Sequence, residues 1–430
     1  MITRVIGLLR GALPPGTIAV GGGLAVLGLA AYVFLALAGH TLSPGGYSSF
    51  SVLWVIIFAV GPGLFFPLEQ ELARVIAARA TRGEPPGAVV RRVSLLAAGF
   101  LAVLLVLTAV GANWLSDQLF DGDTAMTALL MVNLLALSLA HLSRGILAGT
   151  GQFIRYGVQL GLDGTLRCVL AAVVAALGEA SAARFAVALA VAQFISIAAT
   201  STGLLRLPRG EEVAWSEVSA GLGLLLTSSL LSGLVANIGV VIAELLTTEE
   251  ALAGELLSGW VLARVPLFIY ASIQAALLPN LSRALASGDR AGYRRLMVQG
   301  VAAVVALGLA GTAVCVAMGP WLVSVLFDGQ GLLSRADFGW LSIATTVYMV
   351  AMVLGQGVLA QGRHGAQAVG WIVGFSVLVA ATFLPVGVLG RVEGGYLLGS
   401  AAAAVALGAL MTRPVTDLPS PVETISGGAR

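Results

Sequence analysis

The sequence predicts an all-α polytopic membrane protein with about 12 transmembrane helices in two parallel six-helix lobes related by a pseudo-twofold axis. Three observations lead to this fold class: the composition, the number of long apolar segments and an internal repeat. The 430 residues are 58% hydrophobic and 10% charged, with a mean hydropathy of +0.97. A chain with so few polar side chains cannot cover a water-soluble globule, so its surface must face lipid.

Twelve segments approach the roughly 20 apolar residues that a helix needs to cross the hydrocarbon layer. The first follows Arg4 and Arg10 and contains Ala36-Leu-Ala38, which resembles a secretory signal with its cleavage site. We expect it to be retained, because its apolar stretch is longer than a signal core and its removal would leave the first half one span short. In chain order, the segments are expected at about residues 17–38, 47–68, 93–115, 124–148, 156–178, 182–205, 218–243, 256–279, 297–319, 338–360, 366–389 and 394–412.

A nine-residue motif occurs twice. Trp114-Leu-Ser-Asp-Gln-Leu-Phe-Asp-Gly122 recurs as Trp321-Leu-Val-Ser-Val-Leu-Phe-Asp-Gly329, about half the chain length later. Each copy follows a long apolar segment and leads into a short acidic loop, and we expect Asp121 and Asp328 to cap or terminate matching outer loops. Duplicated halves are typical of transporters, in which the cargo site lies in the cavity between the two repeats.

Charge predicts the orientation of the spans. All 23 basic residues are Arg, and they gather in alternate loops, whereas the intervening loops are acidic or neutral. The positive-inside rule makes the Arg-rich loops and both termini cytoplasmic. We expect an N-terminal lobe at 1–206, a C-terminal lobe at 207–412 and a disordered cytoplasmic tail at 413–430. Pro67 and Pro279 should end spans 2 and 8, because proline removes a helix hydrogen bond.

Chemical motifs are few. Cys168 and Cys315 stand alone in separate spans, and the three histidines share no ligand spacing, so we expect neither a disulfide nor a metal site. A chain without Lys cannot build a phosphate-binding Gly-Lys-Ser/Thr loop. The longest stretch outside the spans, about residues 69–92, leaves no room for a soluble catalytic domain. We therefore expect a protein that is not an enzyme, with no cofactor and no nucleic-acid partner, acting as a monomer.

Ionisable side chains within the spans are costly, which makes them functional candidates. Arg264 in span 8 precedes Pro266, which should loosen the helix, and its guanidinium can bind phosphate through two parallel hydrogen bonds. A structural pairing of Arg264 with a carbonyl or a buried acid is the alternative. Asp163 and Arg167 lie four residues apart on one helix face, either as a structural pair or as the ion-coupling site. Asp163 is taken as the only strong acid within the spans.

Weaker candidates surround these groups. Arg144 lies near the cytoplasmic end of span 4, where it either extends to the membrane surface or faces the cavity. Uncharged polar residues within the spans either bind sugar hydroxyls or hold helices together. The predicted substrate site is Arg264, Arg144, Asn237 and Gln274, and the predicted ion-coupling site is Asp163 and Arg167. Further polar residues considered are Gln159, Gln193 and Gln356.

Three stretches carry a family resemblance. Residues 42–51 (LSPGGYSSFS), followed by Arg74, resemble the start of span 2 in O-antigen-type oligosaccharide flippases. Residues 264–283, with an Arg, a nearby Pro and a terminal Leu-Pro-Asn-Leu-Ser, resemble span 8 of lipid II flippases. Residues 146–156 are similar to the end of span 4 in both groups. Both belong to the multidrug/oligosaccharidyl-lipid/polysaccharide (MOP) exporter superfamily. Lipid II flippases carry fourteen spans and further arginines in spans 1 and 2, so this chain fits the twelve-span polysaccharide branch better.

The resemblance implies a secondary-active flippase of the bacterial cytoplasmic membrane. Such a protein moves a polyprenyl-diphosphate-linked saccharide to the outer leaflet by alternating access, driven by a proton, sodium or the membrane potential. By the same resemblance, Arg264 serves the diphosphate. The alternatives are a cation-coupled drug antiporter of the same superfamily, which should have acidic cavity groups, a membrane-embedded glycosyltransferase, which should have a large outer loop, and an inactive family member.

Overall fold

The computed structural model describes residues 17–178, 180–203 and 222–412, and every regular element in these ranges is an α-helix. Ten helices are long and apolar enough to cross a membrane, and α10 (Leu222–Asn237) with α11 (Gly239–Leu246) forms an eleventh span, bent by 51°. Between this bent pair and α14 lie the shorter apolar helix α12 (Leu252–Ala263) and α13 (Val265–Ala286). Arg4, Arg10, the predicted lobe boundary near residue 206 and the tail 413–430 lie outside the described residues.

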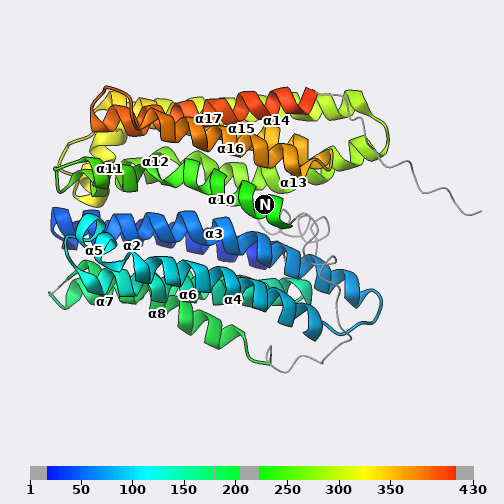
Figure 1. Ribbon diagram of the computed structural model, residues 1–430, viewed down its shortest axis with the longest axis horizontal. Helices are drawn as coiled ribbons and strands as arrows, with labels where there is room; N and C mark the ends of the chain where they lie inside the picture. The colour runs from blue at the N-terminus through cyan, green and yellow to red at the C-terminus, as the bar shows by residue number, and fades with distance from the viewer. Residues whose placement is uncertain (1–16, 179, 204–221, 413–430) are drawn as a thin grey trace, which may run out of the picture.

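The helices form two lobes that lie side by side with their axes roughly along one direction (Figure 1). The first contains α2 (Thr17–Thr41), α3 (Pro44–Ala80), α4 (Gly87–Val110), the short α5 (Ala112–Leu119), α6 (Thr124–Gly149), α7 (Phe153–Ala176) and α8 (Ala182–Thr200). The second contains α10 to α13, α14 (Arg290–Phe327), α15 (Arg335–Ala360), α16 (His364–Ala381) and α17 (Val388–Thr412).

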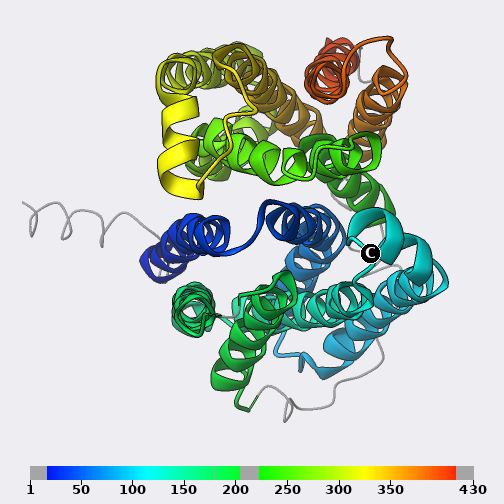
Figure 2. The ribbon, with the colours of Figure 1, turned by 90° about the vertical axis from the view of Figure 1, so that its left-hand side faces the viewer.

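Corresponding helices pack in the same way in both lobes. The pairs α2 with α7, α7 with α8 and α6 with α8 have counterparts in α10 with α16, α16 with α17 and α15 with α17. Seen from one end, the two lobes face each other across α2 and α3 on one side and α10 to α12 on the other (Figure 2). The predicted fold class of about twelve helices in two six-helix lobes is confirmed.

The repeated motif has the same backbone turn in both copies. Asp121 (φ 52°) and Asp328 (φ 54°) are the two non-glycine residues with positive φ in the described ranges. Asp tolerates this left-handed conformation better than most residues because its side chain can form local hydrogen bonds. The motif itself lies in short α5 in the first lobe and in the last turns of α14 in the second. Asp121 lies two residues after the end of α5, and Asp328 lies directly after α14, so both stand where a helical segment gives way to a loop.

Two helix ends were predicted wrongly. Pro67 was expected to end the second span, but α3 continues through it to Ala80, and α13 continues through Pro279 to Ala286. Long membrane helices tolerate proline because neighbouring helices and local adjustments satisfy the freed backbone group. The Arg-rich stretch after span 2 is therefore mostly helix, and only residues 81–86 connect α3 to α4. In this connection, the hydrogen bond from Arg82 lowers the pKa of Glu84.

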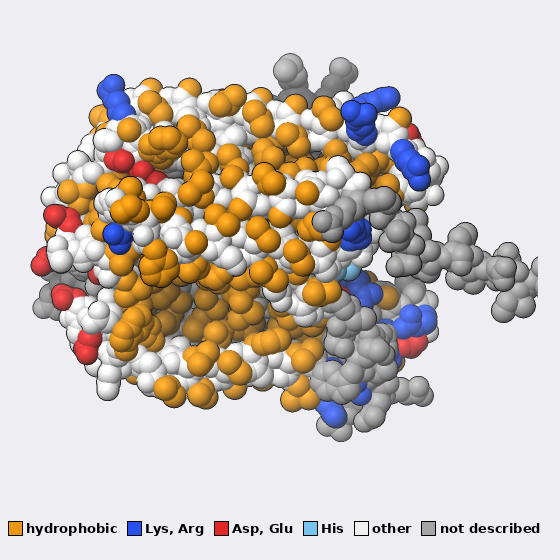
Figure 3. Space-filling model, turned by 45° about the horizontal axis from the view of Figure 1, so that its top comes forward, with side chains coloured by type: hydrophobic (Ala, Val, Ile, Leu, Met, Phe, Trp, Pro, Cys, Tyr) orange, Lys and Arg blue, Asp and Glu red, His pale blue; other side chains and the backbone are white. Residues whose placement is uncertain are grey.

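Basic and acidic side chains gather at opposite ends of the molecule (Figure 3). The turns that join α3 to α4 and α13 to α14 lie at one end, and α5 and α11 lie at the other (Figure 1). We call these the Arg-rich end and the acidic end. Polar residues begin several helices by accepting a backbone N–H, as Ser43 does for α3 and Asp123 does for α6. These caps place the helix ends, and hence the turns, at the two surfaces.

Candidate functional site

Arg264 lies at the break between α12 and α13. Pro266 has no N–H to bond with the carbonyl of Leu262, and that carbonyl instead accepts a weak hydrogen bond from the Cys315 thiol at 3.8 Å. The Arg264 N–H bonds to Val261 at 3.3 Å, three residues back, which tightens the last turn of α12. The loosening that the sequence predicted beside Arg264 therefore takes the form of a one-residue interruption between α12 and α13.

The Arg264 side chain meets a second helix break. Its Nη1 donates to Asn237 Oδ1 at 2.8 Å, and Asn237 is the last residue of α10 before the bend into α11. The guanidinium carbon also lies 5.2 Å from the ring centre of Trp260 and 5.6 Å from that of Tyr396. Two predicted substrate residues, Arg264 and Asn237, are thus brought together, in an aromatic setting that favours a cation.

The guanidinium of Arg264 keeps unused donors. Its Nε and Nη2 are buried without a hydrogen-bond partner, and within the described residues no carboxylate lies within 4.0 Å of it. Tyr32 of the first lobe donates to the Val261 carbonyl at 3.3 Å, so the break lies beside the lobe interface. An unpaired, half-buried cation with two free N–H groups can receive an anionic group from the space between the lobes.

Arg144 joins the other predicted pair instead of lining a cavity with Arg264. Arg167 binds Asp163 through Nε and Nη2, each at 2.9 Å, and Arg144 Nη2 reaches the same carboxylate at 3.3 Å. All three side chains are buried, with Asp163 fully so. Arg144 therefore does not extend to the membrane surface. Two guanidinium groups share one carboxylate, so this cluster carries a net positive charge.

Asp163 is not the only buried acid, contrary to the expectation from sequence. Glu69 of α3 is 4% exposed. Its Oε1 accepts a hydrogen bond from the Tyr156 hydroxyl at 2.6 Å, and its Oε2 lies 2.6 Å from His141 Nδ1, with which it forms a second hydrogen bond. Sequence reasoning placed Glu69 outside span 2, because that span was expected to end at Pro67. Glu255 and Glu393 are also buried, in α12 and α17.

The remaining predicted polar residues are dispersed. Gln274 lies on α13 ten residues after Arg264, about 15 Å further along the helix, so the two do not form one site. Gln159 is fully buried and donates to Ser143 at 2.8 Å, joining α7 to α6. Gln193 and Gln356 are buried in α8 and α15. In the described part of the chain, no three His, Cys, Asp or Glu side chains lie close enough to hold a metal ion.

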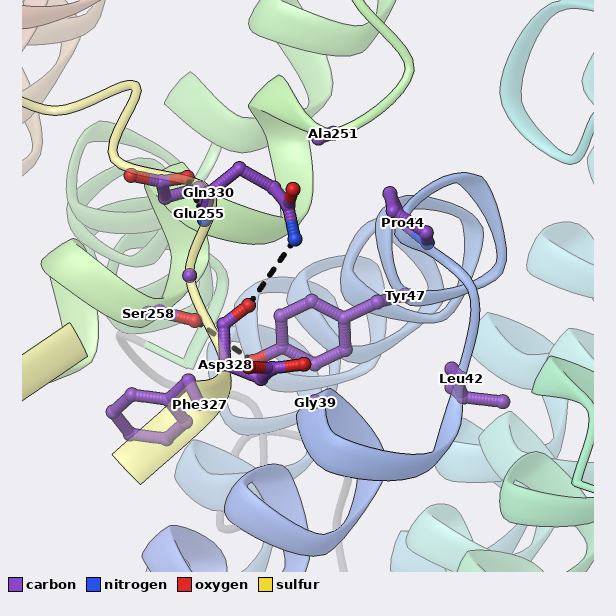
Figure 4. A pocket seen from close by; sticks show the side chains of 11 residues that line it. Gly39, Leu42, Pro44, Tyr47, Ala251, Glu255, Ser258, Phe327, Asp328 and Gln330 are labelled. Atoms are coloured by element: carbon purple, nitrogen blue, oxygen red, sulfur yellow. Dashed lines mark hydrogen bonds between the residues drawn. The ribbon is translucent and has the colours of Figure 1, made fainter. Parts of the chain in front are cut away.

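The lobes are in contact at the acidic end. The Gly254 N–H donates to Ser48 Oγ at 3.0 Å, and the hydroxyls of Tyr47 and Ser258 are 2.9 Å apart. A cavity of about 60 Å³ lies beside Tyr47, bordered by Glu255 and Asp328 (Figure 4). It can hold a few water molecules but no sugar. The second copy of the repeated motif packs here, because Phe327 lies against Gly39 of the first lobe.

Comparisons with known proteins agree with this architecture. No protein-family profile matches the chain. The inward-facing structure of a multidrug resistance MATE family transporter of the MOP superfamily superposes with a TM-score of 0.70 and 14% identity, over 90% of this chain and 95% of that one. The chain has the fold of the MOP-superfamily transporters. A MOP-superfamily transporter from Pyrococcus furiosus, described as having a binding pocket of reverse polarity, gives 0.66 at 15% identity over 91% and 93%.

Two sequence relatives share the length of this MOP-fold chain. Uncharacterized protein Rv3630 of Mycobacterium tuberculosis is 26% identical over 391 residues, which are 84% of each chain. Uncharacterized protein Rv1510 of the same organism is 26% identical over 394 residues, which are 87% of this chain and 86% of the relative. These similarities extend over both lobes of the chain.

Proposed function

We propose that this protein is a secondary-active flippase that moves a polyprenyl-diphosphate-linked saccharide across the bacterial cytoplasmic membrane by alternating access. The Arg-rich end would face the cytoplasm by the positive-inside rule, with both termini on that side. The observation that carries the proposal is Arg264, a cation at two facing helix breaks with two unused N–H donors and, in the described part of the chain, no carboxylate partner. A diphosphate supplies the acceptors that such a fork binds most strongly.

The apolar surface suits the rest of such a cargo. The face shown in Figure 3 is hollowed, and the floor of the hollow is formed by hydrophobic side chains. A prenyl chain can remain in contact with apolar side chains and lipid while the charged head group enters the space between the lobes. No covalent bond need break, because rocking of the two lobes exposes the site to one side at a time.

The charge of the buried groups argues against the main alternative, a drug antiporter. Such a transporter binds organic cations, for which a cavity needs unpaired acids. In the described residues of the first lobe, Asp163 is neutralised by two arginines, and Glu69 bonds to His141 and Tyr156. Among the described residues beside the lobe interface, Arg264 has no counter-ion, whereas the oxygens of buried Glu255 are occupied by the backbone N–H groups of Gln330 and Leu333. Binding of cationic dyes by the purified protein, with no change in lipid-linked saccharides in its absence, would favour the antiporter.

Depletion of the protein tests the proposal. In a strain that depends on this gene, we expect one lipid-linked saccharide to accumulate in the inner leaflet, where mass spectrometry identifies it, and to return to normal on re-expression. The same measurement names the sugar and the lipid carrier. Unchanged levels of every polyprenyl-linked saccharide after depletion would contradict the proposal.

Alternating access predicts that the acidic end must close during the cycle. A Cβ atom on Gly39 would overlap the carbonyl oxygen of Phe327, so Gly39→Leu should hold the lobes apart at this end and stop transport. Gly22→Leu is the matched control, because Gly22 lies on the same helix with no other atom within 4 Å of its added Cβ. Transport of the accumulating saccharide should be abolished by the first change and preserved by the second. Equal transport by both variants would show that this contact does not gate the cargo.

A further inference from the structure

We propose that Glu69 and His141, with Tyr156, form the proton-binding site of the first lobe, and that Asp163 remains ionised throughout the cycle. This inference rests on the proposed transport function for its role, since a secondary-active carrier needs an ion site separate from the cargo site. It assigns the proton to a different cluster from the sequence-predicted pair Asp163 and Arg167.

One proton must lie between Glu69 and His141. His141 Nδ1 and Glu69 Oε2 are 2.6 Å apart, a distance at which two bare acceptors would repel each other. Either the imidazole donates to the carboxylate or the carboxyl donates to the imidazole. When the imidazole donates, the pair carries one net negative charge, and a second proton on the other imidazole nitrogen makes the pair neutral. Histidine is the side chain best suited to such a change near neutral pH.

Asp163 is held in its ionised form by its partners. Both of its oxygens accept from Arg167, and one of them also accepts from Arg144. Protonation of Asp163 would leave two buried guanidinium groups without a counter-ion, which is among the costliest changes a protein interior can undergo. Glu69 has no Arg within 4.0 Å among the described residues, so no guanidinium group is paired with its carboxylate.

The cluster connects the Arg-rich end to the middle of the lobe. Tyr156 is half-buried in the first turn of α7. The same face of that helix then carries, at helical spacing, Gln159, Asp163 and Arg167. His141 and Arg144 lie one turn apart on the facing helix α6. A proton that enters near Tyr156 therefore reaches Glu69 and His141, and its charge is felt by the Arg144 side chain that reaches Asp163.

Other charged groups on the packed helices are few. Within the described residues, α10 has no titratable side chain, and the acids of α11 and α12 and the basic groups of α2 and α8 lie towards the acidic end. Glu71 and Arg74 of α3 bind each other. The other groups around the pair are Arg144 of α6, Tyr156 and Asp163 of α7, and Arg91 and Arg92 in the first turns of α4. None of these lies within ion-pair distance of Glu69.

A pH jump on cargo-free protein tests the assignment. Vesicles containing the purified protein are adsorbed on a sensor electrode, and the solution is changed from about pH 8 to about pH 6, the range in which histidine changes charge. We expect a transient current in the wild type that is clearly smaller in Glu69→Gln and in His141→Gln. The exposed His40 and the half-buried His364 are present in every variant, so their contribution cancels.

Matched variants make the test specific. Glu71→Gln makes the same change on the same helix and should keep the current, as should the paired change Asp163→Asn with Arg167→Met. Size-exclusion chromatography checks that each variant folds. If Glu69→Gln does not fold, the test uses His141→Gln on α6 instead. The assignment would be overturned if folded Glu69→Gln and His141→Gln both gave the wild-type current. It would also be overturned if the current were lost in the Asp163→Asn, Arg167→Met double variant but kept in Glu69→Gln. Because no cargo is present, failure of the flippase proposal would leave this result standing.

Discussion

Arg264→Ala should strongly slow export of the lipid-linked saccharide while the protein remains folded in the membrane. A charge-assisted hydrogen bond contributes about 1.5–3 kcal/mol, so loss of the fork should slow transport by roughly tenfold to a hundredfold or more. The size of the effect follows from the position of Arg264, which has two unused donors and no acid to neutralise it. The measurement is the rate at which the saccharide reaches the outer leaflet in the depleted strain carrying each variant.

Two further variants separate charge from geometry at this site. Arg264→Lys keeps a positive charge but cannot form two parallel hydrogen bonds, so it should transport at an intermediate rate. Arg335→Ala is the control, because Arg335 is exposed at the start of α15. Full transport by Arg264→Ala would remove the main support for an anionic cargo between the lobes.

Asp163→Asn should have the largest effect on stability. It leaves Arg144 and Arg167 buried beside a neutral amide, and breaking a buried ion pair from one side costs about 3–5 kcal/mol. The measurement is thermal unfolding of the purified protein in detergent, which should show a clear fall in melting temperature. Asp117→Asn, at an exposed acid on α5, should leave the melting temperature unchanged.

Removal of one partner together with Asp163 should restore much of that loss. The combination of Asp163→Asn with Arg167→Met eliminates the carboxylate and the guanidinium that binds it through two hydrogen bonds, leaving one cation instead of two. A double variant that melts well above Asp163→Asn would show that unpaired charge is the cause. If Asp163→Asn is as stable as the wild type, the cluster is not the structural element described here.

The two lobes differ in where they place their charged side chains. The second lobe presents a cation to the interface through broken helices, whereas the first lobe encloses its ionisable groups among α3, α6 and α7. The repeat relates the two lobes in their backbone, down to the left-handed Asp121 and Asp328, but not in these side chains.

The sequence by itself determined the membrane spans, the two halves and the distribution of charge at their ends. Each of these depends on hydrophobicity over about 20 residues or on charges in short loops, which are local properties that the solvent selects. The break beside Arg264 was also predictable, because Pro266 acts on its own helix. The lengths of α3 and α13 were not, since tolerance of Pro67 and Pro279 depends on the helices around them.

Only the tertiary structure decided which ionisable groups meet. Glu69 bonds to His141 and Tyr156, which are 72 and 87 residues away, and Arg144 reaches Asp163 across 19 residues. Such contacts depend on how each helix is rotated about its axis and on which helices pack together. Because these spans are apolar on nearly every face, the sequence does not show which face of each helix points inward. Spacing found the pair of Asp163 and Arg167 because both lie on one helix, and it missed Glu69 because its partners lie on two others.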